Sequence, residues 1–252
     1  MPAYSEIASS LTQSLHLMQP PVAVSLADRI PDGVESWSGP VPAGCRFWQE
    51  ASSRVFATSP RDHDLCAIGL YTHNLEMKPA AAADLADALK VFADLSYVRA
   101  EDVAAIPVVA TKSQHVIYGP LAAFPIDPDV VLLFVRPGQI LILSEASQQI
   151  EMGLPPAMGR PACAVIPQAR NTGRSALSLG CCGARAYLEL LSDDTALYAV
   201  PGSALAAFAE RIAALAQAND ILAKFHSLRR KDVEAGKSPT VQESLAVLQS
   251  AG

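Results

Sequence analysis

The sequence predicts an α/β protein, a single compact domain in which a mixed sheet is flanked by helices. Two continuous apolar runs, Val116 to Tyr118 and Val130 to Val135, are bounded by Gly or Pro, which is typical of strands covered on both faces. Segments with apolar residues three and four positions apart lie between such runs and indicate amphipathic helices. The 252 residues are 50% hydrophobic, so the chain has enough apolar side chains for one large core.

The elements of the first half follow from periodicity and from turn residues. Ile7, Leu11 and Leu15 recur every four residues and predict the first helix, which Pro20 and Pro21 end. An alanine-rich stretch predicts the longest helix of this half, because alanine has the highest helix propensity. In order, the predicted elements are a helix over 5–18, a strand over 22–26, a helix that begins near residue 45, a helix over 79–95, and the two strands named above.

The second half is predicted in the same way. Residues 140–143 fit either a strand or the start of a buried helix. Pro167 ends one predicted strand, and Ser203 is the expected N-cap of a long helix. In order, the remaining elements are strands over 162–166 and 175–179, a helix over 184–191, a strand over 197–200, a helix over 205–225, and a final short helix. We expect residues 1–230 to form the domain and residues 231–252 to form a linker and C-terminal helix.

A faint internal duplication suggests two pseudo-symmetric halves, over 20–150 and 160–225. The matching pieces, in the same order in both halves, are 22–24 with 163–165, 66–69 with 181–183, and 129–138 with 194–202. Halves packed about a pseudo-dyad would bring Cys66 and Cys181 to equivalent positions. The alternative is that strands ending in Pro-Gly are simply common.

Composition excludes several classes of function. The net charge is −6, and the one basic cluster, Arg229 to Lys231, is typical of a solvated helix end, so we expect no nucleic-acid partner. The N-terminus does not read as a signal peptide, and the longest apolar run is far too short to span a bilayer. We therefore expect a cytoplasmic protein with no membrane association. An odd cysteine count in a reducing compartment argues against a disulfide framework.

Five cysteines carry most of the chemical signal in the sequence. Thiolates bind soft metals and iron–sulfur clusters because sulfur is polarizable and carries negative charge. The cysteines contain no Cys-x-x-Cys pair, so tertiary structure would have to assemble any shared site. The alternative is that each thiol packs as a small hydrophobe. The five residues are Cys45, Cys66, Cys163, Cys181 and Cys182.

Other candidate residues are weaker. A histidine can supply a base or a metal nitrogen, but a loop histidine is usually only solvated. Arg185, at a strand-to-helix junction, fits either an anion site or an ordinary helix surface. The histidines considered are His63, His73 and His115.

A set of ordered motifs resembles the uncharacterised DUF-type family labelled ArCR, over about residues 20–215. The resemblance implies that Cys45, Cys66, Cys163 and Cys181 occupy the cysteine positions of the family and that Cys182 is an extra thiol. It implies little biochemistry, and the segments outside it are expected to serve packing or dimerisation. The motifs are 21–24, 45–48, 66–69, 118–121, 128–131, 137–139, 163–164 and 178–185.

Three functional hypotheses remain open. The first is an iron–sulfur protein with a cubane (4Fe-4S) cluster, or another soft metal, on the four family cysteines, acting in redox or Lewis-acid chemistry. The second is a non-enzymatic protein that binds or senses a small ligand and has structural cysteines. The third is an enzyme with a cysteine nucleophile, Cys66 or Cys182, activated by His63 or Arg185. The expected partners are a small molecule or a redox protein, with homodimerisation as a further expectation.

Overall fold

The computed structural model describes residues 3–151 and 157–250, and within them the chain forms a seven-stranded sheet. The strand order is β2-β3-β1-β4-β7-β6-β5. Neighbouring strands are antiparallel except for β5 and β6, which are parallel, so the sheet is mixed as predicted. The strands are β1 (Val22–Ala27), β2 (Phe56–Thr58), β3 (His115–Pro120), β4 (Val130–Val135), β5 (Ala157–Met158), β6 (Ala176–Ser178) and β7 (Ala196–Pro201).

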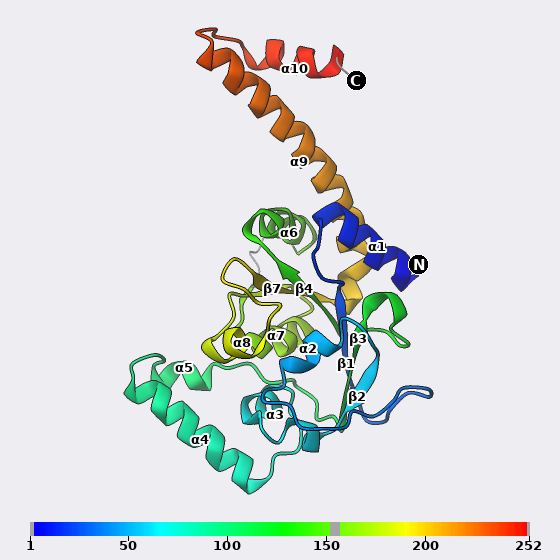
Figure 1. The fold of residues 1–252 in the computed structure, drawn as a ribbon, viewed down its shortest axis with the longest axis vertical. Coiled ribbons are helices and arrows are strands. Elements are labelled where there is room, and N and C mark those ends of the chain that lie inside the picture. The colour runs from blue at the N-terminus through cyan, green and yellow to red at the C-terminus, as the bar shows by residue number, and fades with distance from the viewer. Residues whose placement is uncertain (1–2, 152–156, 251–252) are drawn as a thin grey trace.

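Helices cover both faces of the sheet, which confirms the predicted α/β class (Figure 1). Residues of β4 alternate between two cores, with Leu132 in one and Leu133 in the other, and both are fully buried. One face packs against α1 (Tyr4–Leu15), α6 (Pro137–Ile150) and α9 (Leu205–Glu234). The other, which we call the cysteine face, packs against α2 (Arg46–Glu50), α3 (Ala67–Thr72), α7 (Val165–Thr172) and α8 (Cys182–Tyr187).

The remaining helices lie at the two ends of the molecule. Helix α4 (Pro79–Asp94) and the short α5 (Ala100–Ala104) lie at one end, and α9 projects from the other end towards α10 (Val241–Ser250) (Figure 1). Four 3₁₀ turns connect elements within the described ranges: η1 (Pro60–His63), η2 (Leu121–Ala123), η3 (Ala162–Ala164) and η4 (Gly202–Ala204). In the described part of the chain, no helix is long and apolar enough to cross a membrane.

Most of the predicted elements are confirmed, and the open segment 140–143 is part of helix α6. The predicted strand over 162–166 is wrong, because these residues form η3 and the first turn of α7. Pro167 lies in that first turn, where a missing N–H costs nothing because the first amides of a helix have no intrahelical partner. The same proline therefore begins a helix rather than ending a strand.

The expectations for the C-terminal helix also need correction. Ser203 is not the N-cap of α9, because η4 runs directly into the helix and Ala204 takes that position without a side-chain cap. The predicted linker over 231–239 is shorter than expected, because α9 continues to Glu234 with an Arg230–Glu234 ion pair. The chain leaves the helix at Gly236, whose φ of 78° favours glycine.

The predicted duplication matches the structure in some pieces and not in others. Strands β4 and β7 are antiparallel neighbours, and each leads through Pro-Gly into a helix, α6 or α9. Cys66 and Cys181 are both N-cap residues of short helices. The pairing of 22–24 with 163–165 is wrong, because the first is a strand and the second is helical.

Candidate functional site

Four of the five cysteines lie at the beginnings of the helices on the cysteine face. Cys45, Cys66 and Cys181 are the N-cap residues of α2, α3 and α8, and Cys163 lies in η3 just before α7. Cys163 is buried, with 7% of its surface exposed, and the other three are half-buried. Free backbone amides at helix starts favour negative charge, so these positions suit thiolates.

The four thiols lie within electrostatic range of one another. Burial, with smaller contributions from neighbouring Cys66 and Cys181, raises the pKa of Cys45 to about 12. Burial also raises the pKa of Cys66, with a smaller contribution from Cys181. For Cys163 the pKa is raised first by burial and then by Cys66, Cys181 and Cys45. Every pair among the four therefore interacts, although residues 45 and 181 are far apart in sequence.

Backbone amides are directed at the sulfur of Cys66. The backbone amides of Gly44 and Gly69 lower the pKa of Cys66, which opposes the larger effect of burial. Thr72 Oγ1 lies 3.4 Å from Cys163 Sγ, but its single proton has a nearer acceptor in the carbonyl of Ile68, 2.9 Å away. Amide donors stabilise a thiolate and surround the sulfurs of iron–sulfur centres.

Two glycines leave room around Cys66 Sγ. A Cβ atom on Gly69 would lie 3.1 Å from Cys66 Sγ, and one on Gly44 would lie 3.5 Å from it. The same two Cβ atoms would lie 3.6 and 3.0 Å from Nδ1 of His63. Cys66 and His63 therefore share a space that side chains at positions 44 and 69 would fill. We call these two glycines the glycine cradle.

Two histidines lie fully inside the protein beside this cradle. His63 is 0% exposed and His73 is 2% exposed, and their ring centroids are 6.0 Å apart. Burial lowers the pKa of His63 to about 3, with a smaller effect from His73, and burial lowers the pKa of His73 to about 4. Both rings are therefore neutral at physiological pH.

Several polar atoms on the cysteine face have no hydrogen-bond partner among the described residues. They include the hydroxyl of Tyr118, whose pKa is raised well above 10 by burial and further by Cys66, Cys163 and Cys45. A buried polar atom without a partner is costly, so such atoms in one place indicate that something else satisfies them. The other atoms of this kind on this face are Trp48 Nε1, His63 Nδ1, His73 Nε2 and Arg170 Nε, of which the last forms an ion pair with Asp129.

The described residues do not form a closed site for a single metal ion. In the described residues, no group of three or more His, Cys, Asp or Glu side chains lies close enough together to hold one metal ion. A structural zinc site needs four donors within about 2.3 Å of the ion. An iron–sulfur cluster contains several metal and sulfide atoms and holds its thiolates farther apart. The glycine cradle and the unpartnered atoms are features that such a group would use.

The structure distinguishes the two adjacent cysteines. Cys181 is half-buried and interacts with the other three thiols, whereas Cys182 is exposed as the first residue of α8. Arg185, considered as an activating charge, donates to the backbone carbonyls of Leu179, Ser192 and Thr195. A raised pKa at Cys66 beside a neutral His63 does not favour a nucleophile there.

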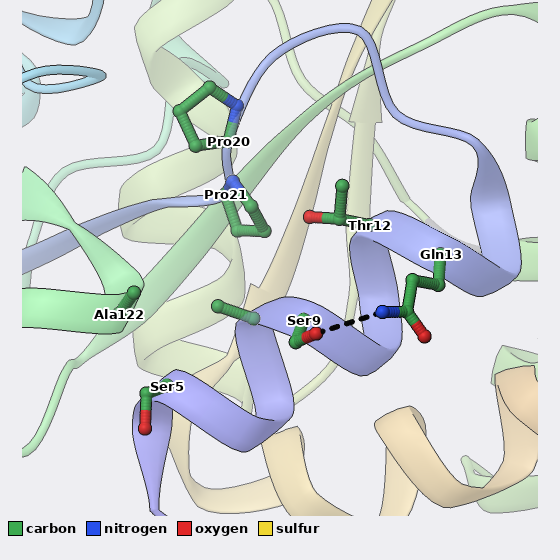
Figure 2. A pocket seen from close by; sticks show the side chains of 8 residues that line it. Ser5, Ser9, Thr12, Gln13, Pro20, Pro21 and Ala122 are labelled. Atoms are coloured by element: carbon green, nitrogen blue, oxygen red, sulfur yellow. Dashed lines mark hydrogen bonds between the residues drawn. The ribbon is translucent and has the colours of Figure 1, made fainter.

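A shallow surface depression of about 300 Å³ lies beside helix α1, on the other face of the sheet (Figure 2). Ser9, Thr12 and the Pro20-Pro21 turn line it, and Gln13 Nε2 donates to Ser9 Oγ over 3.2 Å. Its lining carries no titratable side chain, so it offers none of the chemistry gathered on the cysteine face.

The fold and this site define an α/β protein with four converging thiols on one helix-covered face of its sheet. The model of the uncharacterised family DUF169, labelled ArCR, matches residues 10–211, and the chain belongs to this family. The resemblance seen in the sequence is thereby confirmed. Comparison with curated proteins and with solved structures gave no match.

Sequence reasoning found the four thiols but not their buried polar neighbours. The sequence contains no sign that His63 and His73 converge, and it indicates only a strand position for Tyr118. The available signal was local: His63 lies three residues before Cys66, in a turn where Cys66 N donates to His63 O over 2.7 Å. His115 begins β3 and is partly buried, and its Nδ1 also has no hydrogen-bond partner among the described residues.

Proposed function

We propose that the protein binds a cubane iron–sulfur cluster through Cys45, Cys66, Cys163 and Cys181 and acts in redox or Lewis-acid chemistry in the cytoplasm. The convergence of these four thiols carries the proposal. They come from separate segments, and burial together with mutual repulsion raises the pKa of three of them. Binding a cationic centre would remove both penalties, because the bound sulfurs are deprotonated and their charge is offset.

The chain supplies the donors and the shape that such a group needs. When bound, the cluster would take up and release an electron or present one iron as a Lewis acid. Gly44 and Gly69 make room for it and direct their amides at the sulfur of Cys66. The buried Tyr118 hydroxyl offers a further donor towards the same group.

The position of the site favours exchange with a small molecule or a redox protein. Three of the four thiols are half-buried rather than enclosed. Leu65 next to Cys66 is 68% exposed, and Leu179 near Cys181 is 56% exposed, so apolar surface lies beside the thiols. A partner that covers these residues would approach the site closely.

The test is metal and sulfide analysis of protein purified without oxygen. We expect iron and acid-labile sulfide in the native protein and a brown colour. Cys66→Ser should bleach the protein, because it replaces a ligand that two amides orient. Cys182→Ser is the matched control, since it changes an exposed neighbouring thiol, and it should keep the native iron content. Colourless native protein without iron or sulfide would refute the proposal.

A further inference from the structure

One tautomer of His63 satisfies both of the contacts that Thr58 makes. Thr58 Oγ1 lies 3.2 Å from the carbonyl of Val116, to which it can only donate, and 3.0 Å from His63 Nε2, so both contacts are hydrogen bonds when Nε2 donates to Thr58. Nε2 therefore carries the proton and Nδ1 carries a lone pair. Metal-binding histidines are usually oriented in this way, by a hydrogen bond from the ring nitrogen that does not bind the metal.

His63 Nδ1 and Cys66 Sγ border the same space beside the glycine cradle. His63 is 0% exposed, and Nδ1 has no hydrogen-bond partner in the part of the chain that the structure describes. Both glycines of the cradle lie against this nitrogen and against the sulfur, at the distances given above. A desolvated lone pair without a hydrogen-bond partner is unfavourable unless a cation or a donor binds it.

His73 offers an informative comparison. Its Nδ1 lies 2.8 Å from the carbonyl of Gly69, so this nitrogen is protonated and Nε2 carries the lone pair. That Nε2 atom also lacks a partner among the described residues. The two histidines are thus equally buried, and in each ring one nitrogen donates a hydrogen bond. Only His63 Nδ1, however, lies beside the same two glycines as a cysteine sulfur.

We propose that His63 Nδ1 is a fifth protein donor at the cysteine site and ligates one iron of the bound group in place of one of the four thiolates. This inference rests on the proposed function, because it assigns a ligand to the same group. It predicts mixed sulfur and nitrogen ligation, whereas the four cysteines alone would give a thiolate-only centre.

The test uses the full chain reconstituted without oxygen from ferrous iron and sulfide, reduced, and labelled with ¹⁵N only in histidine. Pulsed EPR should detect a strongly coupled histidine nitrogen in the native protein. His63→Asn should lose this coupling while it keeps at least half of the native iron, because four thiols remain. His73→Asn is the matched control and should keep both the coupling and the iron.

The outcomes separate this inference from the proposed function. Protein that binds iron and sulfide without a strongly coupled histidine nitrogen would refute the role of His63 and leave the cluster in place. The same conclusion would follow if the coupling were lost in His73→Asn and kept in His63→Asn. Protein that takes up neither iron nor sulfide would refute both proposals. The measurement on the native chain needs no variant and stands even if a variant unfolds.

Discussion

Replacing Tyr118 by phenylalanine should change stability in opposite directions with and without the metal group. The Tyr118 hydroxyl is fully buried and has no hydrogen-bond partner in residues 3–151 and 157–250. Leaving a buried polar group unpaired costs about 1–3 kcal/mol, so its removal should stabilise the metal-free protein by roughly 1 kcal/mol. For a chain of this size, this corresponds to a rise in Tm of about 2–4 °C.

The sign should reverse in the loaded protein. There the hydroxyl can donate to a charged sulfur, and a hydrogen bond to a charged group contributes about 1.5–3 kcal/mol. Tyr118→Phe should therefore lower the Tm of the loaded form and shift its reduction potential to a more negative value. The assay is differential scanning calorimetry of both forms, together with a redox titration.

Tyr198 provides the matched control. It is as deeply buried as Tyr118, but its hydroxyl lies 3.0 Å from Ser175 Oγ and 3.2 Å from the carbonyl of Leu143. Tyr198→Phe should destabilise both forms by about 1 kcal/mol, since it removes satisfied hydrogen bonds. The reasoning is wrong if Tyr118→Phe destabilises the metal-free protein as much as Tyr198→Phe does.

Two further predictions concern the cradle and acid stability. Gly69→Ala should lower iron content and destabilise the protein by about 1 kcal/mol, because a Cβ 3.1 Å from Cys66 Sγ forces a shift. Gly138→Ala in helix α6 meets no atom within 4 Å and should stabilise by about 0.5–1 kcal/mol in urea unfolding. Because burial holds the pKa values of His63 and His73 at about 3 and 4, the unfolded chain binds more protons below about pH 6.5. Stability of the metal-free protein should fall between pH 6.5 and 4, by about 1.4 kcal/mol per pH unit for each ring. His73→Asn should roughly halve this slope, and an unchanged slope would contradict the assignment.

The central sheet was predictable because its strands are uninterrupted runs of apolar residues. Residues 130–135 are apolar without interruption and become the fully buried β4. The apolar stretch around Cys163 looks similar, yet it is helical, since periodicity cannot separate a short buried strand from a buried helix turn. Strand β2 and helix α3 are so short that their positions depend on tertiary contacts rather than on local pattern.

The candidate site was predictable in composition but not in geometry. The sequence shows which residues can bind a metal, and the family resemblance selects four of the five cysteines. Cys181 and Cys182 are adjacent in sequence, so only the start of helix α8 decides which thiol turns inward. The environment of His63 is formed by Thr58, Val116 and two glycines, which come from four different segments. Contacts between segments so far apart cannot be predicted from a local sequence pattern.

The separation of the four thiols along the chain also restricts when any group that needs all of them can be inserted. A ribosome adds about 5–20 residues per second, so Cys181 is made on the order of ten seconds after Cys45. During that interval the earlier thiols belong to an incomplete chain that lacks β6, β7 and α8. Insertion must therefore follow translation of most of the polypeptide, and nascent chains stalled before residue 176 should fail to retain iron.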